Sequence, residues 1–150
     1  MEKLPKEKLD ASPYAPRRKR DFFHYEIVKC KTCGLLRSDP LIDENELKQF
    51  YFDSECSYTD DNENIPLKKT YGHYFTNILN KYDVETNSFL DIGCSNGFIL
   101  EQALEFGFKK IMGVEPSRDA IDQASSSIKP FIVNGMFDNK MFEKDSFDMI

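Results

Sequence analysis

The second half of this 150-residue chain predicts an α/β fold, in which a parallel sheet is flanked by helices. Short apolar runs at residues 88–92, 110–115 and 131–133 are typical of buried strands. Helical patterns separate these runs, and strands that alternate with helices imply parallel pairing through right-handed crossovers. A further apolar run, at residues 147–150, predicts the start of a fourth strand.

The helix expected before the first of these strands has the clearest pattern. Pro66 suits a first helical position, and the pattern continues to about Tyr82, weakened slightly by Gly72. Its apolar side chains recur at spacings of three and four residues, which predicts one buried face. They are Leu67, Tyr71, Tyr74, Phe75, Ile78, Leu79 and Tyr82.

The later helices are bounded by ordinary start and stop residues. Gly107 should end a helix over residues 97–106, and Ser117 should cap the next helix, a segment that Pro130 ends. The side chains expected inside the first of these two helices are Phe98, Leu100, Ala103 and Leu104. The order of elements is Rossmann-like, but only four strands can be counted. We therefore expect a Rossmann-like parallel sheet with flanking helices that is incomplete at its C-terminal half.

Two regions precede this domain, which we assign to residues 66–150. Residues 1–21 predict an irregular leader, since they are rich in proline and carry a basic run at residues 17–20. Residues 22–65 form an N-terminal element that is rich in aromatic and acidic side chains.

Within the N-terminal element, residues 22–28 could be a strand that leads into a pair of cysteines. Asp39 and Pro40 break the chain after it. Asp43, with Glu46 three residues later, is typical of a helix start, so we expect a short helix through Tyr51. Residues 60–64 predict an exposed loop.

Composition and charge exclude several classes of protein. No apolar run approaches the roughly 20 residues of a membrane helix, and no signal peptide opens the sequence. Four cysteines do not make a disulfide scaffold, so the cytoplasm is the expected location. The net charge is −6, and residues 21–150 alone carry 13 basic and 23 acidic residues, which makes nucleic acid an unfavourable partner.

The turn after the first strand carries the most informative motif. Asp91 ends the strand, and Gly93, Ser95 and Gly97 lead into a helix. A glycine at Gly93 lets the backbone turn tightly beside a ligand, and one at Gly97 lets the helix pack close to the strand. The free N–H groups of the helix N-terminus then face the ligand, which is typical of nucleotide binding.

This spacing distinguishes the turn from two better-known ones. The dinucleotide fingerprint is G-x-G-x-x-G, whereas the small residues here follow G-x-S-x-G. G-x-S-x-G also occurs in the hydrolase nucleophile elbow, but that site needs a downstream histidine, and no histidine follows His73. Cys94 has no recognisable base partner and is not expected to act as a nucleophile.

A second acidic residue ends the next strand. Glu115 follows the apolar run at residues 110–114, and Pro116 comes directly after it. A carboxylate at this place can accept hydrogen bonds from both hydroxyls of a ribose. The two strands, the small-residue turn and the two terminal acids together are more specific than any one of them.

These motifs resemble those of the class I S-adenosylmethionine-dependent methyltransferases, over residues 88–150. DIGCSNG, GVEPS, a VNG turn and a closing FDMI occur in the order that family uses. The resemblance implies that Asp91 lies near the amino-acid end of S-adenosylmethionine and that Glu115 holds its ribose. The turn of Gly93, Cys94, Ser95 and Gly97 would wrap the methionine part, and Gly135 with Met136 would lie beside the adenine. Pro116, next to Glu115, is also expected among the cofactor-binding residues.

The sequence also departs from the family's pattern at two points. Ser95 replaces a more usual glycine, and the acid that often lies beside adenine comes late, at Asp138. The acceptor pocket and any catalytic base of the family commonly follow later strands, so the catalytic residues stay unknown. His73 lies before the first strand and is a weak candidate for a base. We accordingly expect this chain alone to be incomplete, poorly soluble and inactive.

Cys30 and Cys33, followed by Gly34, have the spacing of a zinc knuckle. Some sugar-modifying and related small-molecule methyltransferases carry two such cysteine pairs near the N-terminus, and this pair resembles the second. A structural zinc needs four ligands, and neither His24 nor Cys56 has a recognisable ligand spacing. We expect zinc only in a complete protein, and little in this chain by itself.

The sequence therefore favours S-adenosylmethionine-dependent methyl transfer to a small-molecule acceptor, such as a sugar or a nucleotide-linked sugar. Two alternatives stay open. The chain could be a non-catalytic cofactor-binding remnant or a zinc-ribbon interaction module, or it could be an NAD-dependent Rossmann oxidoreductase. The sequence specifies neither the chemical type of the methylated atom nor the oligomeric state.

Overall fold

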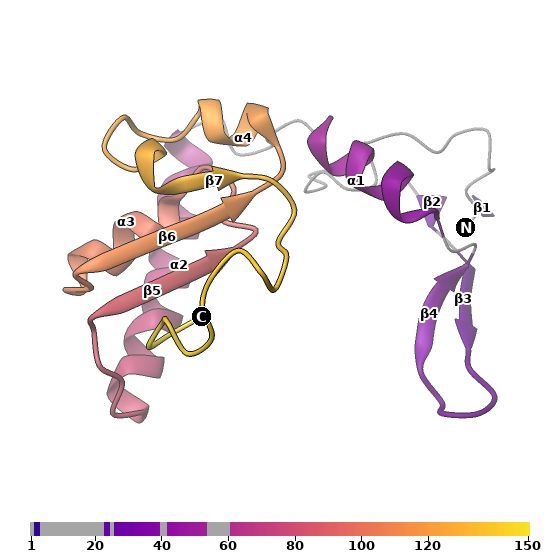
Figure 1. Cartoon of the computed structure of the whole chain (residues 1–150), viewed down its shortest axis with the longest axis horizontal. Helices are drawn as coiled ribbons and strands as arrows, with labels where there is room; N and C mark the ends of the chain where they lie inside the picture. Colours follow the sequence, from indigo (N-terminus) through magenta and orange to yellow (C-terminus); the bar gives the residue numbers. More distant parts are fainter. Residues whose placement is uncertain (1, 4–22, 25, 40–41, 54–60) are drawn as a thin grey trace.

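The computed structural model describes residues 2–3, 23–24, 26–39, 42–53 and 61–150 (Figure 1). It confirms the α/β class: a three-stranded parallel sheet carries helices, and a separate hairpin precedes it. The strands are β1 Glu2–Lys3, β2 Phe23–His24, β3 Glu26–Lys29, β4 Leu36–Asp39, β5 Ser88–Ile92, β6 Lys110–Glu115 and β7 Ile132–Asn134. The α-helices are α1 Glu44–Phe52, α2 Asp61–Lys81, α3 Phe98–Glu105 and α4 Arg118–Asp122.

The sheet has the strand order β5-β6-β7, with every pair parallel. The predicted fourth strand at residues 147–150 is only partly formed. Met149 makes a single parallel bridge to Phe89, on the side of β5 away from β6. The backbone N–H of Leu90 also donates to the carbonyl of Met149, so residues 147–150 begin to pair with the free side of β5, although only one bridge is formed.

Asp148 fastens this last segment to the start of β5. Its Oδ2 accepts hydrogen bonds from the backbone N–H and the hydroxyl of Ser88, both at 2.7 Å. The backbone N–H of Asp148 in turn donates to the carbonyl of Ser88. The contact spans 60 residues of sequence and closes the sheet on the β5 side.

One face of the sheet is packed against α2 and α3 through an aromatic cluster. Phe75, in α2, lies with its ring centre 5.3 Å from that of Phe89 in β5 and 5.7 Å from that of Phe108. Phe106 stacks on Phe75 at 5.3 Å. Aromatic rings bury large apolar areas, so this cluster holds the two helices against the sheet. The other members of the buried core are Cys94, Leu100, Ala103, Ile111 and Ile128.

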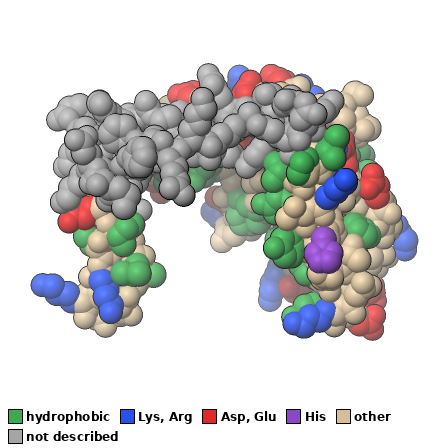
Figure 2. Space-filling model, turned by 180° about the vertical axis from the view of Figure 1, so that it is seen from behind, with side chains coloured by type: hydrophobic (Ala, Val, Ile, Leu, Met, Phe, Trp, Pro, Cys, Tyr) green, Lys and Arg blue, Asp and Glu red, His purple; other side chains and the backbone are tan. Residues whose placement is uncertain are grey.

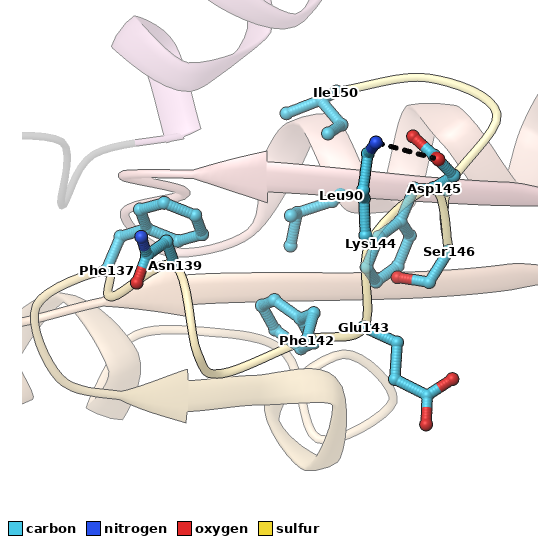
Figure 3. A pocket seen from close by; sticks show the side chains of 10 residues that line it. Leu90, Phe137, Asn139, Phe142, Glu143, Lys144, Asp145, Ser146 and Ile150 are labelled. Atoms are coloured by element: carbon cyan, nitrogen blue, oxygen red, sulfur yellow. Dashed lines mark ion pairs between the residues drawn. The ribbon is translucent and has the colours of Figure 1, made fainter.

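The opposite face is covered by the chain that follows β7. Leu90, whose side chain is 2% exposed, points to this side and lines a cavity of about 300 Å³ (Figure 3). Phe142 and Phe147, whose rings meet edge to face at 5.2 Å, lie on its other side. Residues 135–150 contain no helix, so irregular chain takes the place of a helical layer here.

The N-terminal element contains a strand that the sequence did not predict. β3 and β4 form an antiparallel hairpin with Val28 opposite Arg37, and the two cysteines lie in its connection. The expected strand over residues 22–28 is replaced by β2 and β3, and residues 22 and 25 lie outside the described part of the chain. The expected irregular leader, residues 1–21, is described only at Glu2–Lys3, which form a short strand that pairs with β2. The other residues of the leader lie outside the described part of the chain.

The short helix after the hairpin is confirmed. The side chain of Asp43 caps α1 by accepting hydrogen bonds from the N–H groups of Asn45 and Glu46. The exposed loop expected over residues 60–64 was wrong for residues 61–64, which form the first turn of α2. Pro66 then lies inside the helix, where it costs one backbone hydrogen bond.

Smaller corrections concern the segments around the later strands. Leu104, near the C-terminal end of α3, is 42% exposed, whereas Phe98, Leu100 and Ala103 of the same helix are buried as expected. The third strand begins at Ile132, since residues Lys129–Phe131 form a short 3-10 helix. α4 ends at Asp122, well before Pro130. None of the helices in the described ranges has the length and apolar character that crossing a bilayer requires.

Gly97→Ala should cost more stability than Gly107→Ala. Both glycines have positive φ, 76° and 98°, where an L side chain costs about 1–2 kcal/mol. A Cβ at Gly97 would lie 2.5 Å from Cγ2 of Ile128, whereas one at Gly107 meets nothing within 4 Å. Overpacking should therefore add about 1–3 kcal/mol at Gly97 alone. Urea unfolding of both variants measures the difference, and equal losses would contradict the packing argument.

Candidate functional site

The candidate site lies where the carboxyl ends of β5, β6 and β7 meet. Parallel strands place these ends at the same edge of the sheet, which is where open α/β sheets bind ligands. Residues 93–97 follow β5, residues 116–117 follow β6, and residues 135–136 follow β7. The structure thus brings together all of the cofactor-binding residues that the sequence suggested.

The turn after β5 depends on three left-handed residues. Gly93, Ser95 and Gly97 have φ values of 82°, 51° and 76°. The N–H groups of Gly93 and Cys94 both donate to the carbonyl of Val114 in β6, at 2.8 and 3.3 Å. The turn is therefore anchored to the neighbouring strand. Ser95 adopts a backbone conformation that favours glycine. A serine at this position, where the family more usually has glycine, therefore adds some strain to the turn.

The two glycines of the turn have different surroundings. A Cβ on Gly97 would collide with Ile128, so this glycine allows α3 to approach the core. A Cβ on Gly93 would meet no atom within 4 Å. Gly93 therefore faces open space on the side where a ligand would lie, and its own packing in the protein does not require a glycine.

Glu115 links the two turns. Its side chain is buried, at 8% exposed, and Oε2 accepts a hydrogen bond from the N–H of Ser95 at 2.8 Å. Oε1 accepts from the N–H of Ser117, also at 2.8 Å. Charge-assisted bonds of this kind are about twice as strong as neutral ones. One carboxylate therefore holds both the turn after β5 and the start of α4.

Two buried acceptors beside this carboxylate have no partner among the described residues. They are Oδ2 of Asp91 and Oδ1 of Asn96. Burial raises the pKa of Asp91 from 3.8 to about 6, with a further contribution from the negative charge of Glu115. A buried acceptor without a donor is costly, so both atoms indicate a ligand that carries donors or a positive charge.

Asn134 is a positioning residue that the sequence did not predict. Its side-chain Nδ2 donates to the carbonyls of Glu115 and Pro116, at 3.0 and 2.9 Å. The N–H of Gly135 donates to the same Glu115 carbonyl at 3.0 Å. The turn after β7 is thereby fixed to the turn after β6. The indication that the sequence offered for this role was a polar residue placed directly between an apolar run and Gly135.

Three other predicted residues contribute in a more limited way. The side chain of Cys94 is 2% exposed and packs under the turn, where its sulfur would lie 2.5 Å from a Cβ on Gly113. Burial raises the pKa of this thiol, so Cys94 is not poised as a nucleophile. Only its backbone can face a ligand. Pro116 and Met136 are half-buried at the same sheet edge.

These observations fit an adenosyl cofactor with a charged amino-acid end. The backbone at Gly93 leaves room, the N-terminus of α3 has no side-chain cap, and Asp91 offers an unpaired carboxylate oxygen. A carboxylate has about four acceptor positions, so Glu115 can still accept from ribose hydroxyls while it holds the two N–H groups. NAD, with its pyrophosphate, would instead bring negative charge towards Asp91 and Glu115.

The remaining candidates lie outside this site. His73 is exposed on α2, where it contacts Asn77, 3.0 Å from its Nε2, and the ring of Tyr74, both in the same helix. Cys30 and Cys33 lie in the β3–β4 hairpin, and Cys56 is outside the described residues. Within the described ranges, no three His, Cys, Asp or Glu side chains are grouped so that they could hold a metal.

Asp91→Asn should stabilise the protein at neutral pH and lose that effect in acid. The folded-state pKa of Asp91, about 6, lies above the ordinary 3.8, so the folded state binds this proton more tightly. The free energy of unfolding of the wild-type protein should therefore fall as the pH rises from about 4 to about 6, by on the order of 3 kcal/mol. Urea unfolding across this range tests it. Asp83→Asn, at an exposed position after α2, is the control, and a pH-independent effect of Asp91→Asn would contradict the assignment.

Comparison with known proteins agrees with this geometry. Residues 90–150 match the model of a family described as a methyltransferase domain, the class that uses S-adenosylmethionine. No curated protein matches the chain. The matched segment begins at Leu90 in β5 and includes the turn, both terminal acids and the segment after β7. The part of the chain that forms the candidate site therefore has the sequence pattern of a methyltransferase domain.

Proposed function

We propose that this chain binds S-adenosylmethionine and serves methyl transfer to a small-molecule acceptor. The observation that carries the proposal is the combination of open space at Gly93 with the unpaired, buried oxygen of Asp91. A ligand with a cationic amino group would satisfy that oxygen and relieve its repulsion with Glu115. The match of residues 90–150 to a methyltransferase domain supports the same cofactor.

Each residue of the site then has a separate task. Asp91 would accept from the amino group, and the backbone from Gly93 to Gly97 would enclose the methionine part. Glu115 would accept from the ribose hydroxyls with its remaining lone pairs. Gly135 and Met136 would lie beside the adenine, in a turn that Asn134 fixes by its two hydrogen bonds to the backbone after β6.

The chemistry requires orientation more than proton transfer. The cofactor, when bound, supplies a methyl group already activated on a sulfonium, which an acceptor can displace in line. The protein holds the donor in one conformation and excludes water, and such positioning accounts for much of the barrier reduction in reactions of two bound groups. Asp91 and Glu115 contribute by binding and orienting. No described residue is assigned as a base.

The acceptor proposed is a small polar molecule such as a sugar or a nucleotide-linked sugar. The net charge of −6 disfavours nucleic acid as an acceptor, because binding of phosphate backbones depends on basic side chains. An oxygen or nitrogen acceptor in such molecules can be methylated by the same displacement. A remnant that binds the cofactor without turnover is the non-enzymatic alternative, and an acceptor screen with radiolabelled cofactor separates the two.

Gly93→Ala should abolish cofactor binding, while Gly107→Ala should leave it unchanged. The two positions have similar positive φ, and a methyl group added at either would have no atom within 4 Å, so the folding cost should be similar. Only the methyl at Gly93 would enter the space proposed for the ligand. Calorimetry with S-adenosylhomocysteine measures the effect, with NAD as the competing ligand. Binding of NAD in place of the adenosyl ligand, or equal affinities for the two variants, would contradict the proposal.

Glu115→Ala should weaken binding of S-adenosylhomocysteine by roughly 1.5–3 kcal/mol, because hydrogen bonds from the ribose to a charged acceptor are lost. The same change frees the N–H groups of Ser95 and Ser117, so stability must be measured in parallel. Glu105→Ala, at an exposed position in α3, is the matched control. Unchanged affinity in a folded Glu115→Ala protein would refute the ribose contact.

A further inference from the structure

We propose that the cavity between β5 and the chain after β7 binds a small, uncharged aromatic molecule that carries one hydrogen-bonding group. The cavity lies on the face of the sheet opposite to α2 and α3. Those helices are turned towards the reader in Figure 2, where apolar and charged side chains are interspersed over the surface. The lining of the cavity contains neither of the two terminal acids and no residue of the turn after β5, so this site is separate from the cofactor site.

The walls of the cavity are apolar and largely aromatic. Leu90, on β5, faces Phe142 across the cavity (Figure 3), and Phe147 also lines it. The rings of Phe142 and Phe147 meet edge to face at 5.2 Å, and the ammonium group of Lys110 lies 5.1 Å from the centre of the Phe147 ring. These contacts hold Phe147 from two sides, so the aromatic wall is formed without a ligand. Such walls favour flat apolar molecules that pack against the rings.

The volume of the cavity, about 300 Å³, limits the size of the ligand. An apolar cavity of roughly 150 Å³ accommodates one benzene ring. The cavity therefore suits a molecule of two fused rings. Phe137, which also belongs to the lining, is 44% exposed, so a ligand can enter from solvent on that side.

One buried polar atom of the lining has no partner among the described residues. It is the hydroxyl oxygen of Ser146. A buried hydroxyl without a hydrogen bond costs free energy, and native proteins leave few such groups unpaired. A hydroxyl can both donate and accept, so one O–H or N–H group on the ligand would satisfy it. Ser146 therefore accounts for the single polar group of the proposed ligand.

The backbone directly before Ser146 is strained. Asp145 has a φ of 58°, and the only other non-glycine residue with positive φ in the described part of the chain is Ser95, in the turn of the candidate cofactor site. Strain of this kind persists where the surrounding structure enforces it, and it is common where ligands bind. The chain changes direction at Asp145, and the Ser146 hydroxyl is directed towards the other lining residues (Figure 3).

The charged groups of the lining lie at its rim. The side chains of Lys144 and Asp145 pair with each other and are 91% and 83% exposed. Glu143 and Asn139 are exposed as well. The interior therefore offers no charge that could compensate an ionic ligand, and burying an unpaired charge is costly. This is why the proposed ligand is uncharged.

The test uses the full chain with 2-naphthol as the probe and naphthalene as the same ring system without a hydroxyl group. The chain contains no tryptophan, so the fluorescence of 2-naphthol can be followed directly, and naphthalene is measured by its displacement of 2-naphthol. We expect both probes to bind, with nuclear Overhauser contacts between their ring protons and the methyl groups of Leu90. Absence of binding, or contacts with other parts of the protein in place of Leu90, would overturn the proposal.

Ser146→Ala should weaken binding of 2-naphthol about three- to tenfold, because one hydrogen bond is lost, and should leave naphthalene unchanged. Since the hydroxyl has no partner among the described residues, its removal should not weaken the fold, which urea unfolding checks. Ser126→Ala, at an exposed position after α4, is the matched control and should change neither affinity.

Binding of S-adenosylhomocysteine should be the same in the wild-type protein and in both serine variants, so failure here stays distinct from failure of the proposed function. An unchanged affinity of Ser146→Ala for 2-naphthol, or an equal loss for both probes, would contradict the assignment of the polar group and overturn the proposal.

Discussion

The carboxylate of Glu115 is the contact on which the rest of the candidate site depends. It lies at the end of β6 and accepts from the N–H groups of Ser95 and Ser117, which belong to two different turns. A buried carboxylate is costly unless donors compensate its charge, so Glu115 is stabilised here because both turns present their N–H groups to it. The strained φ of Ser95 is tolerated because its N–H makes this bond. A neutral side chain of the same size would hold the turns less strongly.

The same carboxylate sets the electrostatics of its neighbour. Asp91 is held near Glu115 without a donor for its Oδ2, and its pKa rises as a result of burial and of this second negative charge. The protein therefore keeps two acidic groups close together at the sheet edge, an arrangement that disfavours folding but suits a cationic ligand. Stability is commonly lower at functional sites for this reason. The aromatic cluster around Phe75, on the α2 and α3 side, supplies packing that offsets it.

Much of the fold could be predicted from the sequence, because strands β5 and β6 are continuous apolar runs bounded by glycine and acidic residues. The turn of residues 93–97 was identifiable for the same reason, since glycine spacing reflects backbone conformation directly. The hairpin strand β4 was missed because Arg37 and Asp39 are polar and lie in an exposed ribbon without hydrophobic alternation. The start of α2 was missed because its first turn is polar and a proline follows it.

The charged residues and the glycines of the site could be predicted from the sequence, whereas its asparagine side chains could not. Asn134 acts through the hydrogen bonds that its amide nitrogen donates to two backbone carbonyls, and Asn96 through a buried oxygen without a partner among the described residues. An asparagine in a turn is usual for many other reasons. The direction of the Cys94 side chain could not be predicted either, since position in the turn does not tell whether a side chain points at a ligand or at the core. The structure shows it buried beside Gly113.

The contact between Asp148 and Ser88 has a consequence for how the sheet assembles. β5, α3 and β6 are close in sequence and can pair early, because closing a short loop costs little entropy. Asp148 is 60 residues from Ser88, so the segment around it must find the β5 edge after the intervening chain has folded. The docking of residues 147–150 against β5 is therefore expected to be slower than the pairing of β5 with β6, and the two bonds from Ser88 to one carboxylate oxygen of Asp148 favour one register for it.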